Sequence, residues 1–264
     1  MRLAACLLLV AAAGAGAQDE VPFITTPDKV TLAMLELAQV GPNDHVIDLG
    51  SGDGRIVITA AKRFGASGQG VEIVPDLVRQ SRENARAAGV TQRVEFREQD
   101  LFKTDLRRAS VVTLYLLPEI NLQLRPRLLA LPAGTRIVSH DWDMGDWAAE
   151  RSVTLDVPDK TIGRDKTSTV HLWLVPARVD GLWCSAGASL RVTQRFGQFS
   201  AVLHTATRRD TPALVFDGRI AGTRLHARHP HDAALEADAQ GLRVLRIGTP
   251  GSAVAGRVFK RGRC

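Results

Sequence analysis

The chain has 264 residues, of which 45% are hydrophobic, and this length suits one large domain or two modest ones. Its formal net charge is +6, but aromatic residues make up only 5% of it, with Tyr115 the single tyrosine. Nucleic-acid-binding surfaces usually interleave basic side chains with stacking aromatics, so the composition argues against a nucleic-acid partner. The core must be built mainly from leucine, valine, isoleucine and alanine.

The first residues have the order of a secretory signal peptide. Arg2 gives a positive start, residues 3–13 are apolar, and residues 15–17 form a small-residue cleavage site. The apolar run is too short to span a bilayer comfortably. We therefore expect a signal peptide over residues 1–17, export to the periplasm, and no stable membrane span in the mature chain. A cytoplasmic protein is expected only if the signal does not function.

The next part of the chain alternates between strand and helix patterns. Thr26 as N-cap and Pro27 as first helical residue predict a helix that runs to Val40. Strands are then predicted at 45–49, 69–74, 93–97, 111–116 and 135–140, and helices at 54–64, 75–88 and 119–130. This alternation favours an α/β fold with a doubly wound, mostly parallel, Rossmann-like sheet. Two further runs, 152–157 and 168–175, predict an edge hairpin and bring the sheet to seven strands.

A glycine-rich turn follows the first predicted strand. Residues 46–55 read VIDLGSGDGR, so glycines alternate with other residues directly after an acid. The dinucleotide fingerprint G-x-G-x-x-G has a different spacing, and carboxylates at Asp48 and Asp53 would repel a pyrophosphate. The same carboxylates would attract the ammonium group of an amino-acid ligand. A dinucleotide-dependent oxidoreductase and a tight turn that binds nothing are the alternatives.

Acids stand at three successive predicted strand ends, namely Asp48, Glu72 and Asp100. Carboxyl ends of parallel strands face one crevice, so all three can meet one ligand. Glu72 could accept hydrogen bonds from two ribose hydroxyls, or it could be an ordinary surface glutamate. Asp100 could contact the same ligand, or it could cap a turn.

The form D-x-G-x-G-x-G resembles motif I of class I S-adenosylmethionine (SAM)-dependent methyltransferases. Further matching segments are Thr-Pro at 26–27, Val-Glu-Ile at 71–73, Leu-Tyr-Leu-Leu-Pro-Glu at 114–119 and Ser-His-Asp at 139–141. Together with motif I, these segments make about residues 20–175 resemble one subgroup of this family. The eukaryotic relatives of the subgroup are small mitochondrial protein-lysine N-methyltransferases. The resemblance implies SAM as cofactor and methyl transfer to a nucleophile, with a protein lysine as one candidate acceptor.

The resemblance also implies roles for individual residues. It assigns the cofactor-binding residues to Asp48, Gly50, Ser51, Gly52, Gly54, Glu72, Asp100 and Leu101. In the resembling family the fourth strand end faces the transferred methyl group, and the candidate catalytic residues are Tyr115, Glu119 and Asp141. Tyr115 could equally be a packed aromatic, and Glu119 a charge in the first turn of a helix. His140 beside Asp141 suggests either a general base or a hydrogen-bonded structural histidine.

Near residue 177 the composition changes, and no long helical pattern follows. Short alternating runs occur at 189–194, 200–205, 213–216, 219–227, 241–247 and 254–260, with Asp217-Gly218 predicting a hairpin turn. We therefore expect a methyltransferase-like domain over 18–177 and a small antiparallel β domain, a roll or barrel, over 178–264.

Cys184 and Cys264 remain after the predicted cleavage. Export would permit a disulfide between them, and two isolated thiols are the alternative. No Cys/His spacing in the chain is that of a zinc site. Export also leaves open a second hypothesis, a non-catalytic binding or scaffold protein on a methyltransferase fold, because SAM is not expected outside the cytosol.

Overall fold

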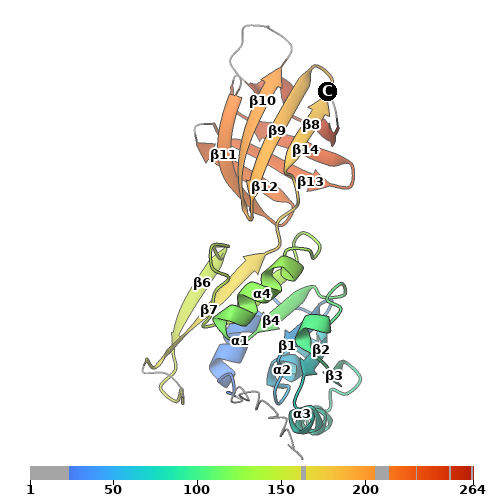
Figure 1. Cartoon of the computed structure of the whole chain (residues 1–264), viewed down its shortest axis with the longest axis vertical. Helices are drawn as coiled ribbons and strands as arrows, with labels where there is room; N and C mark the ends of the chain where they lie inside the picture. The colour runs from blue at the N-terminus through green and yellow to red at the C-terminus, as the bar shows by residue number, and fades with distance from the viewer. Residues whose placement is uncertain (1–23, 162–164, 206–213, 230, 250, 263) are drawn as a thin grey trace, which may run out of the picture.

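The computed structural model describes residues 24–264 except 162–164, 206–213, 230, 250 and 263. The described residues form a seven-stranded sheet with helices and, after it, a closed β-barrel (Figure 1). The predicted signal peptide lies outside the described residues. Within the described part of the chain, no helix is both long enough and apolar enough for a bilayer crossing.

The sheet has the strand order β3-β2-β1-β4-β5-β7-β6. Its parallel strands are β1 (His45–Leu49), β2 (Ser67–Glu72), β3 (Val94–Glu98), β4 (Val111–Leu114) and β5 (Arg136–His140). The hairpin of β6 (Arg151–Asp156) and β7 (Thr167–Leu174) pairs antiparallel with β5 through β7. The predicted doubly wound, mostly parallel sheet is therefore confirmed.

Four helices cover the two faces of this sheet. They are α1 (Asp28–Leu37), α2 (Arg55–Phe64), α3 (Pro75–Ala87) and α4 (Pro118–Leu128). Alternate strand residues separate the two cores: Val46 packs with α1 and α2, whereas its neighbour Ile47 packs with α4. This is the period-2 alternation of a strand that is buried on both faces.

The start of α1 differs from the prediction. The helix begins at Asp28, its N-cap is Pro27, and no side chain caps it. The expected N-cap, Thr26, is buried, and its carbonyl oxygen accepts a hydrogen bond from Arg55 Nη1 at 2.8 Å. The segment before α1 is therefore held by the first residue of α2 instead of by a cap of its own.

The barrel is formed by eight antiparallel strands. They are β8 (Gly181–Ser185), β9 (Ala188–Arg195), β10 (Gln198–Thr205), β11 (Leu214–Ala221), β12 (Arg224–His229), β13 (Ala233–Asp238), β14 (Gly241–Ile247) and β15 (Val258–Arg261). Its interior is a packed core that includes Phe199, Phe216 and Phe259. The barrel closes where β15 pairs with β8, and a disulfide joins Cys184 to Cys264 beside this pairing.

The predicted hairpin turn at Asp217-Gly218 is wrong. The strand β11 continues through both residues, with a bulge between them, and the turn lies at Gly222 instead. A Cβ added to Gly218 would lie 2.1 Å from the carbonyl oxygen of His226, so glycine here permits the close approach of β12. The strand predicted at 254–260 begins later in the structure, at Val258, because residues 251–254 form a 3₁₀ turn before β15. The sequence patterns missed β8 and β13.

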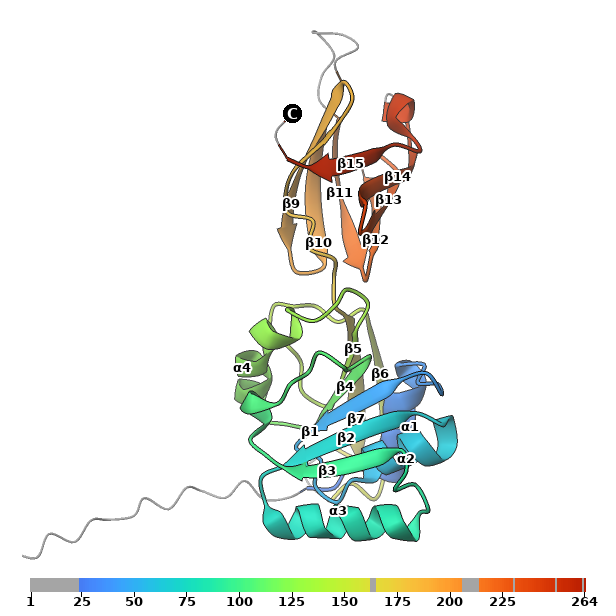
Figure 2. The ribbon, with the colours of Figure 1, turned by 90° about the vertical axis from the view of Figure 1, so that its right-hand side faces the viewer.

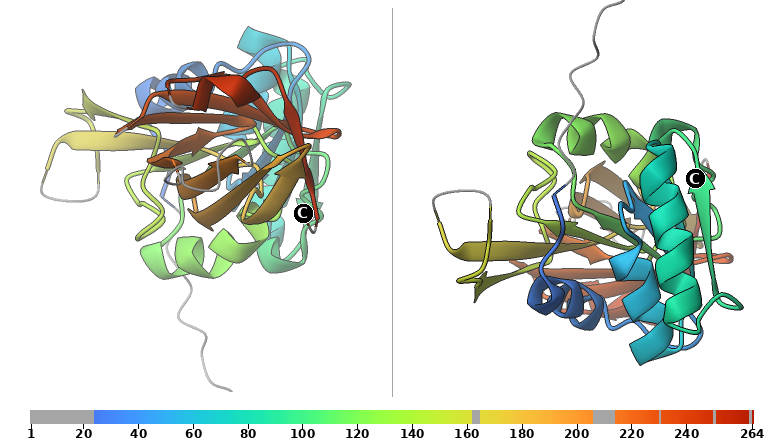
Figure 3. Two further views of the ribbon diagram at one scale, coloured as in Figure 1. Left: turned by 90° about the horizontal axis from the view of Figure 1, so that it is seen from above. Right: turned by 90° about the horizontal axis from the view of Figure 1, so that it is seen from below.

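The barrel leaves the sheet at the amino ends of the parallel strands. Because β7 is antiparallel to β5, its last residue, Leu174, pairs with Arg136 at the start of β5. Figure 2 shows the barrel as a separate body beyond this edge, and Figure 3 shows it from both ends. Contacts at the junction include a 2.7 Å ion pair between Arg195 and Asp146 and stacking of Phe196 on Trp147.

Candidate functional site

The glycine-rich loop joins β1 to α2 with an unusual backbone. Gly50, Gly52 and Gly54 have φ angles of +77°, +50° and +82°, which are favourable only for glycine. The N–H groups of Gly50 and Ser51 both donate to the carbonyl oxygen of Val71 at 2.9 Å. The loop therefore crosses directly over the end of β2.

Glu72 at the end of β2 is held against this loop. Its Oε2 accepts a hydrogen bond from the N–H of Gly52 at 3.0 Å. Its Oε1 accepts from the N–H groups of Ile73 and Val74, at 2.8 and 3.1 Å. A carboxylate has about four acceptor positions, so one remains on Oε2 for a ligand hydroxyl. The structure thus brings Glu72 to the glycine loop, as a ribose-binding acid requires.

Asp48 is a buried carboxyl group at the start of the loop. It lies opposite Thr113 in β4, whose hydroxyl donates to Asp48 Oδ1 at 2.6 Å. Burial, with a smaller contribution from the charges of Glu72 and Asp53, raises the pKa of Asp48 to about 7, although the hydrogen bond from Thr113 opposes this shift. Asp53 does not act as a second free carboxylate, because Arg55 binds both of its oxygens. Of the two acids in the motif, only Asp48 could attract a ligand ammonium group.

Asp100 and Leu101 follow β3 at the same edge. Asp100 Oδ1 accepts from the N–H of Phe102 at 2.8 Å and so caps the 3₁₀ turn Leu101–Lys103. The turn-capping alternative for Asp100 is therefore present in the structure. Leu101 is half-buried against the core on the α4 side. The Ser51 hydroxyl is buried and has no hydrogen-bond partner within the described residues.

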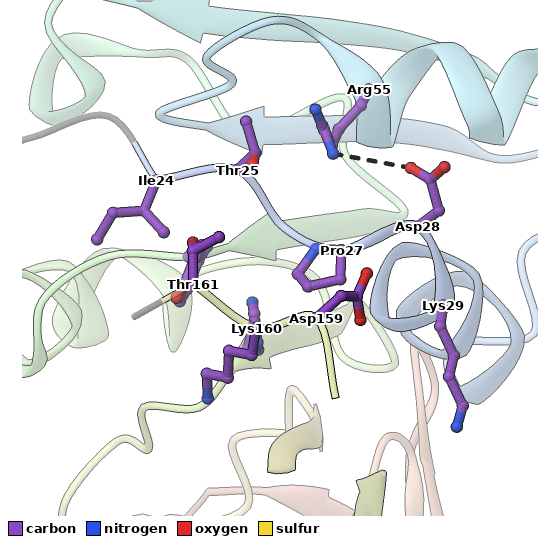
Figure 4. A pocket seen from close by; sticks show the side chains of 11 residues that line it. Ile24, Thr25, Pro27, Asp28, Lys29, Arg55, Asp159, Lys160 and Thr161 are labelled. Carbon is purple, nitrogen blue, oxygen red and sulfur yellow. Dashed lines mark ion pairs between the residues drawn. The ribbon is translucent and has the colours of Figure 1, made fainter. Parts of the chain in front are cut away.

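A cavity of about 260 Å³ opens at the carboxyl ends of β4 and β5. We call it the β4–β5 cavity. It is lined by residues 24, 25 and 27–29 of the lead and α1, by Arg55, by Tyr115 and His140 at the strand ends, and by residues 159–161. In Figure 4 the lead segment runs beside the segment with Asp159, Lys160 and Thr161, and Arg55 pairs with Asp28. None of the predicted cofactor-binding residues lines this cavity, but Arg55, directly after the last loop glycine, does, so the cavity lies beside the glycine loop.

Tyr115 and His140 form one wall of the β4–β5 cavity. Their rings stack with centroids 3.9 Å apart. Burial raises the pKa of Tyr115, and the charge of Asp141 adds to this effect. The His140 side chain is fully buried, and burial lowers its pKa to about 4. The wall is therefore aromatic and uncharged near neutral pH.

Asp141 follows β5 with a left-handed backbone, at φ +61°. Its Oδ1 accepts from the N–H of Thr169 at 2.9 Å, and its Oδ2 accepts from Lys160 Nζ at 2.6 Å. The same Oδ2 lies 3.4 Å from His140 Nε2. A non-glycine residue held in this backbone region costs about 1–3 kcal/mol, which the surrounding contacts must offset. Asp141 is therefore a paired carboxylate behind the cavity wall.

The three candidate catalytic residues differ in their position relative to the β4–β5 cavity. Tyr115 lines the β4–β5 cavity, and Asp141 supports it through His140. Glu119 lies exposed in the first turn of α4 and does not line the cavity. Sequence reasoning missed Lys160, which lies in a segment with no recognisable pattern. It also missed the role of Arg55, although Arg55 stands directly after the last loop glycine.

Comparisons with known proteins agree with this geometry. The family model of the ANTKMT methyltransferase domain matches residues 48–151. A protein-lysine N-methyltransferase of Saccharolobus islandicus is 41% identical over 157 residues, which are 59% of this chain and 94% of that protein. The adenine nucleotide translocase lysine N-methyltransferase of Mus musculus is 34% identical over 48% of this chain and 56% of its own length.

A solved structure is also similar. It is an RNA methyltransferase from Salinibacter ruber in complex with S-adenosyl-L-homocysteine, 51% identical, with a TM-score of 0.54. The match covers 59% of this chain and 96% of that one.

The chain belongs to the class I SAM-dependent methyltransferases, in the family of the S. islandicus protein-lysine N-methyltransferase. It is an enzyme, and SAM is its cofactor, so these predictions are confirmed. The residues present fit SAM: Glu72 keeps a free acceptor position beside the glycine loop, and Asp48 is a buried acid without a cationic partner in the described residues. The sulfonium of SAM supplies a methyl group that is already activated for transfer.

Proposed function

We propose that this methyltransferase acts on the ε-amine of a lysine side chain in a protein. The observation that carries the proposal is the β4–β5 cavity, which places an uncharged aromatic wall beside the cofactor loop. The 41% identity with the S. islandicus protein-lysine N-methyltransferase supports it.

The reaction needs a neutral acceptor nitrogen. Its lone pair attacks the methyl carbon while the carbon–sulfur bond breaks and its electron pair stays on sulfur. Such an attack requires the two atoms roughly 3–3.5 Å apart and in line with the bond that breaks. Burial against Tyr115 and His140 lowers the pKa of an entering amine, because desolvation disfavours its ammonium form. Asp141 does not reverse this effect, because Lys160 balances its charge.

The test is methylation of lysine-containing proteins with SAM that carries a labelled methyl group. We expect methyllysine in the hydrolysed product and no label in an acceptor whose lysines are blocked. Gly52→Arg and Glu72→Ala should abolish SAM binding in calorimetry together with activity. Wild-type SAM binding that survives both substitutions would contradict the cofactor site, and label that persists in blocked protein would contradict the lysine acceptor.

An RNA acceptor is the second candidate, and one specific observation favours it. The S. ruber relative, 51% identical, is described as an RNA methyltransferase. The scarcity of aromatic residues disfavours this candidate. Total RNA and total protein should therefore be offered together, and the labelled product digested with nuclease and protease separately. Label released only by nuclease would replace the lysine proposal.

We also propose that the protein is exported, with residues 18–177 as the catalytic domain and 178–264 as a separate β domain. The signal-peptide pattern of residues 1–17 motivates export. The disulfide between Cys184 and Cys264 is typical of an oxidising compartment and supports it. Cell fractionation with N-terminal sequencing should find a periplasmic chain that begins at Gln18. A full-length cytoplasmic chain with free thiols would contradict export.

A further inference from the structure

The strand β6 forms an open edge of the seven-stranded sheet. It is last in the strand order, and among the described strands only β7 pairs with it (Figure 1). All of its residues except half-buried Leu155 are exposed. Its pairing with β7 runs without a register shift, it contains no proline, and its charged residues Arg151 and Asp156 stand only at its two ends. The edge therefore lacks the usual features that keep a further strand from pairing.

The hydrogen bonds of the hairpin show which backbone groups of β6 face this open edge. The residue after β6, Val157, donates its N–H to the carbonyl oxygen of Lys166 at 2.7 Å. This contact continues the register of β6 with β7, so the odd-numbered residues of β6 direct their backbone groups toward β7. Alternate residues of a strand direct these groups to opposite sides. Ser152 and Thr154 therefore direct both N–H and C=O to the open edge.

The open edge adjoins the β4–β5 cavity. Asp156 also directs its carbonyl oxygen outward, and Lys29 Nζ donates to it at 2.9 Å. Lys29 lines the cavity, and so do residues 159–161, which follow β6 closely in the chain. Both β5 and β6 are antiparallel to β7, so β6 ends on the same side of the sheet as β5, which ends at His140 in the cavity wall.

An extended polypeptide has the groups that fit this edge. Its alternate residues each present one N–H and one C=O, as Ser152 and Thr154 do. Between them, Val153 is 37% exposed on the face of the hairpin that carries Val170, so an apolar side chain of an added strand can pack beside it. A nucleic-acid backbone has no matching row of alternating donors and acceptors.

We propose that β6 binds the substrate protein by β-strand addition, with an extended segment beside the acceptor lysine pairing with Ser152 and Thr154. The inference rests on the proposed lysine acceptor and adds how the chain around that lysine is held. The backbone contacts do not depend on the substrate's sequence, whereas the cavity receives the lysine itself. The paired segment lies on one side of the lysine in the sequence, because the cavity adjoins only the carboxyl end of β6.

Backbone N-methylation of an acceptor peptide tests the proposal without changing the enzyme. The probe is a synthetic peptide around a lysine that the wild-type enzyme labels in protein. Each N-methyl group removes one N–H, and we expect KM to rise about fivefold at alternate positions on one side of the lysine, as for loss of a hydrogen bond. The intervening positions and kcat should change less than about twofold.

A KM profile without this alternation would overturn strand addition, whether it is flat or rises at every position. Failure of the proposed function looks different, because the wild-type enzyme would then methylate no lysine in protein. A methylated lysine together with a flat profile leaves the lysine acceptor standing and rejects only the role of β6.

A substitution in β6 gives an independent measurement. Thr154→Pro removes an outward N–H but no N–H of the ladder with β7, and proline is tolerated at such edge positions. We expect KM for the peptide to rise about fivefold, with kcat and SAM affinity within about twofold of wild type. Thr154→Val is the matched control, because it keeps the N–H and loses only the hydroxyl that lies 3.0 Å from Thr169 Oγ1. Its KM should equal that of the wild type.

Wild-type KM in Thr154→Pro, or the same rise in KM for both substitutions, would contradict a backbone contact at this edge. Thermal unfolding establishes that each variant is folded. If Thr154→Pro does not fold, the N-methylated peptides decide the question with the unchanged enzyme.

Discussion

The two carboxylates of the glycine-rich motif differ in whether a cation balances their charge. Asp48 is buried with a hydroxyl as its hydrogen-bond donor, whereas Asp53, five residues later, is bound by the guanidinium of Arg55 at both oxygens. A buried charge without a cation nearby destabilises the folded state. A buried ion pair is tolerated, but removing one of its partners destabilises the folded state. The two acids of one motif should therefore respond in opposite directions to the same substitution.

Asp48→Asn should stabilise the protein above neutral pH. The folded-state pKa of Asp48 is about 7 and its ordinary value is 3.8, so between these values the folded chain binds a proton that the unfolded chain releases. Its contribution to stability therefore falls as the pH rises through this window. Asparagine removes that dependence, and we expect a gain of about 1–3 kcal/mol at pH 8 and little gain near pH 4. SAM affinity should fall, because the attractive charge is lost.

Thermal unfolding at pH 4 and pH 8 measures this effect. Asp53→Asn is the matched control and should destabilise the protein at both pH values, because Arg55 loses its partner. Equal melting temperatures for wild type and Asp48→Asn at pH 8 would show that Asp48 carries no buried charge.

At the level of elements, the loop between β1 and α2 depends on glycine for packing as well as for backbone conformation. A Cβ at Gly54 would lie 2.7 Å from two ring carbons of Phe96 and 2.9 Å from Cβ of Ser81. The start of α2 is therefore packed directly against β3 and α3. Gly54 therefore supplies the left-handed backbone of the loop and also lets the start of α2 pack on the sheet.

Gly54→Ala should destabilise the protein by about 2–5 kcal/mol, because a left-handed backbone and overpacking both add to the cost. Gly89→Ala is a suitable control, since Gly89 has φ +70° but no atom within 4 Å of an added Cβ. It should cost only about 1–2 kcal/mol. Denaturant unfolding measures both values, and equal losses would contradict the packing role of Gly54.

The closure of the barrel depends on a short seam. The strands β15 and β8 pair through only two residue pairs, and the disulfide from Cys184 to Cys264 closes a loop with a sequence separation of 80. Replacing both cysteines with serine should destabilise the barrel by about 4 kcal/mol, because the unfolded chain regains the entropy of the open loop. The barrel transition is followed by tryptophan fluorescence, to which Trp183 contributes from the barrel. Reductant should reproduce the loss in the wild-type protein and have no effect on the double variant. A reductant-insensitive wild type would contradict the role of the disulfide.

At the level of the whole molecule, the barrel and the cofactor loop lie at opposite ends of the parallel strands. The chain enters the barrel after β7, beside the amino end of β5, whereas Asp48, Glu72 and Asp100 lie at or after the carboxyl ends of β1, β2 and β3. None of the described barrel residues therefore lines the β4–β5 cavity. Its contacts with the sheet domain include those of Phe196 with Trp147 and of Arg195 with Asp146.

A chain of residues 18–177 should therefore bind SAM with an affinity within about threefold of the full protein. The S. islandicus and S. ruber relatives are matched over 94% and 96% of their lengths by 59% of this chain, which supports a catalytic part that stands alone. Its stability should be lower, because Phe196 no longer covers Trp147. Calorimetry with SAM is the measurement. Loss of binding by a folded fragment would show that the barrel acts on the site.

The sequence by itself determined the α/β sheet, its strand ends and the acids that stand there. These follow from short-range patterns: buried strands, intervening helices, and a loop in which glycine supplies positive φ angles. The parallel sheet then places Asp48, Glu72 and Asp100 at one edge without further information.

Only the tertiary structure decided which side chains pair across the chain. Lys160 meets Asp141 from the segment after β6, Arg55 removes Asp53 from the ligand side, and Gly218 lies inside a strand because β12 passes close to it. Cys184 and Cys264 become neighbours only because the barrel closes. Packing of the folded chain decides which groups meet in each of these contacts and how closely. A local pattern of residues carries no such information.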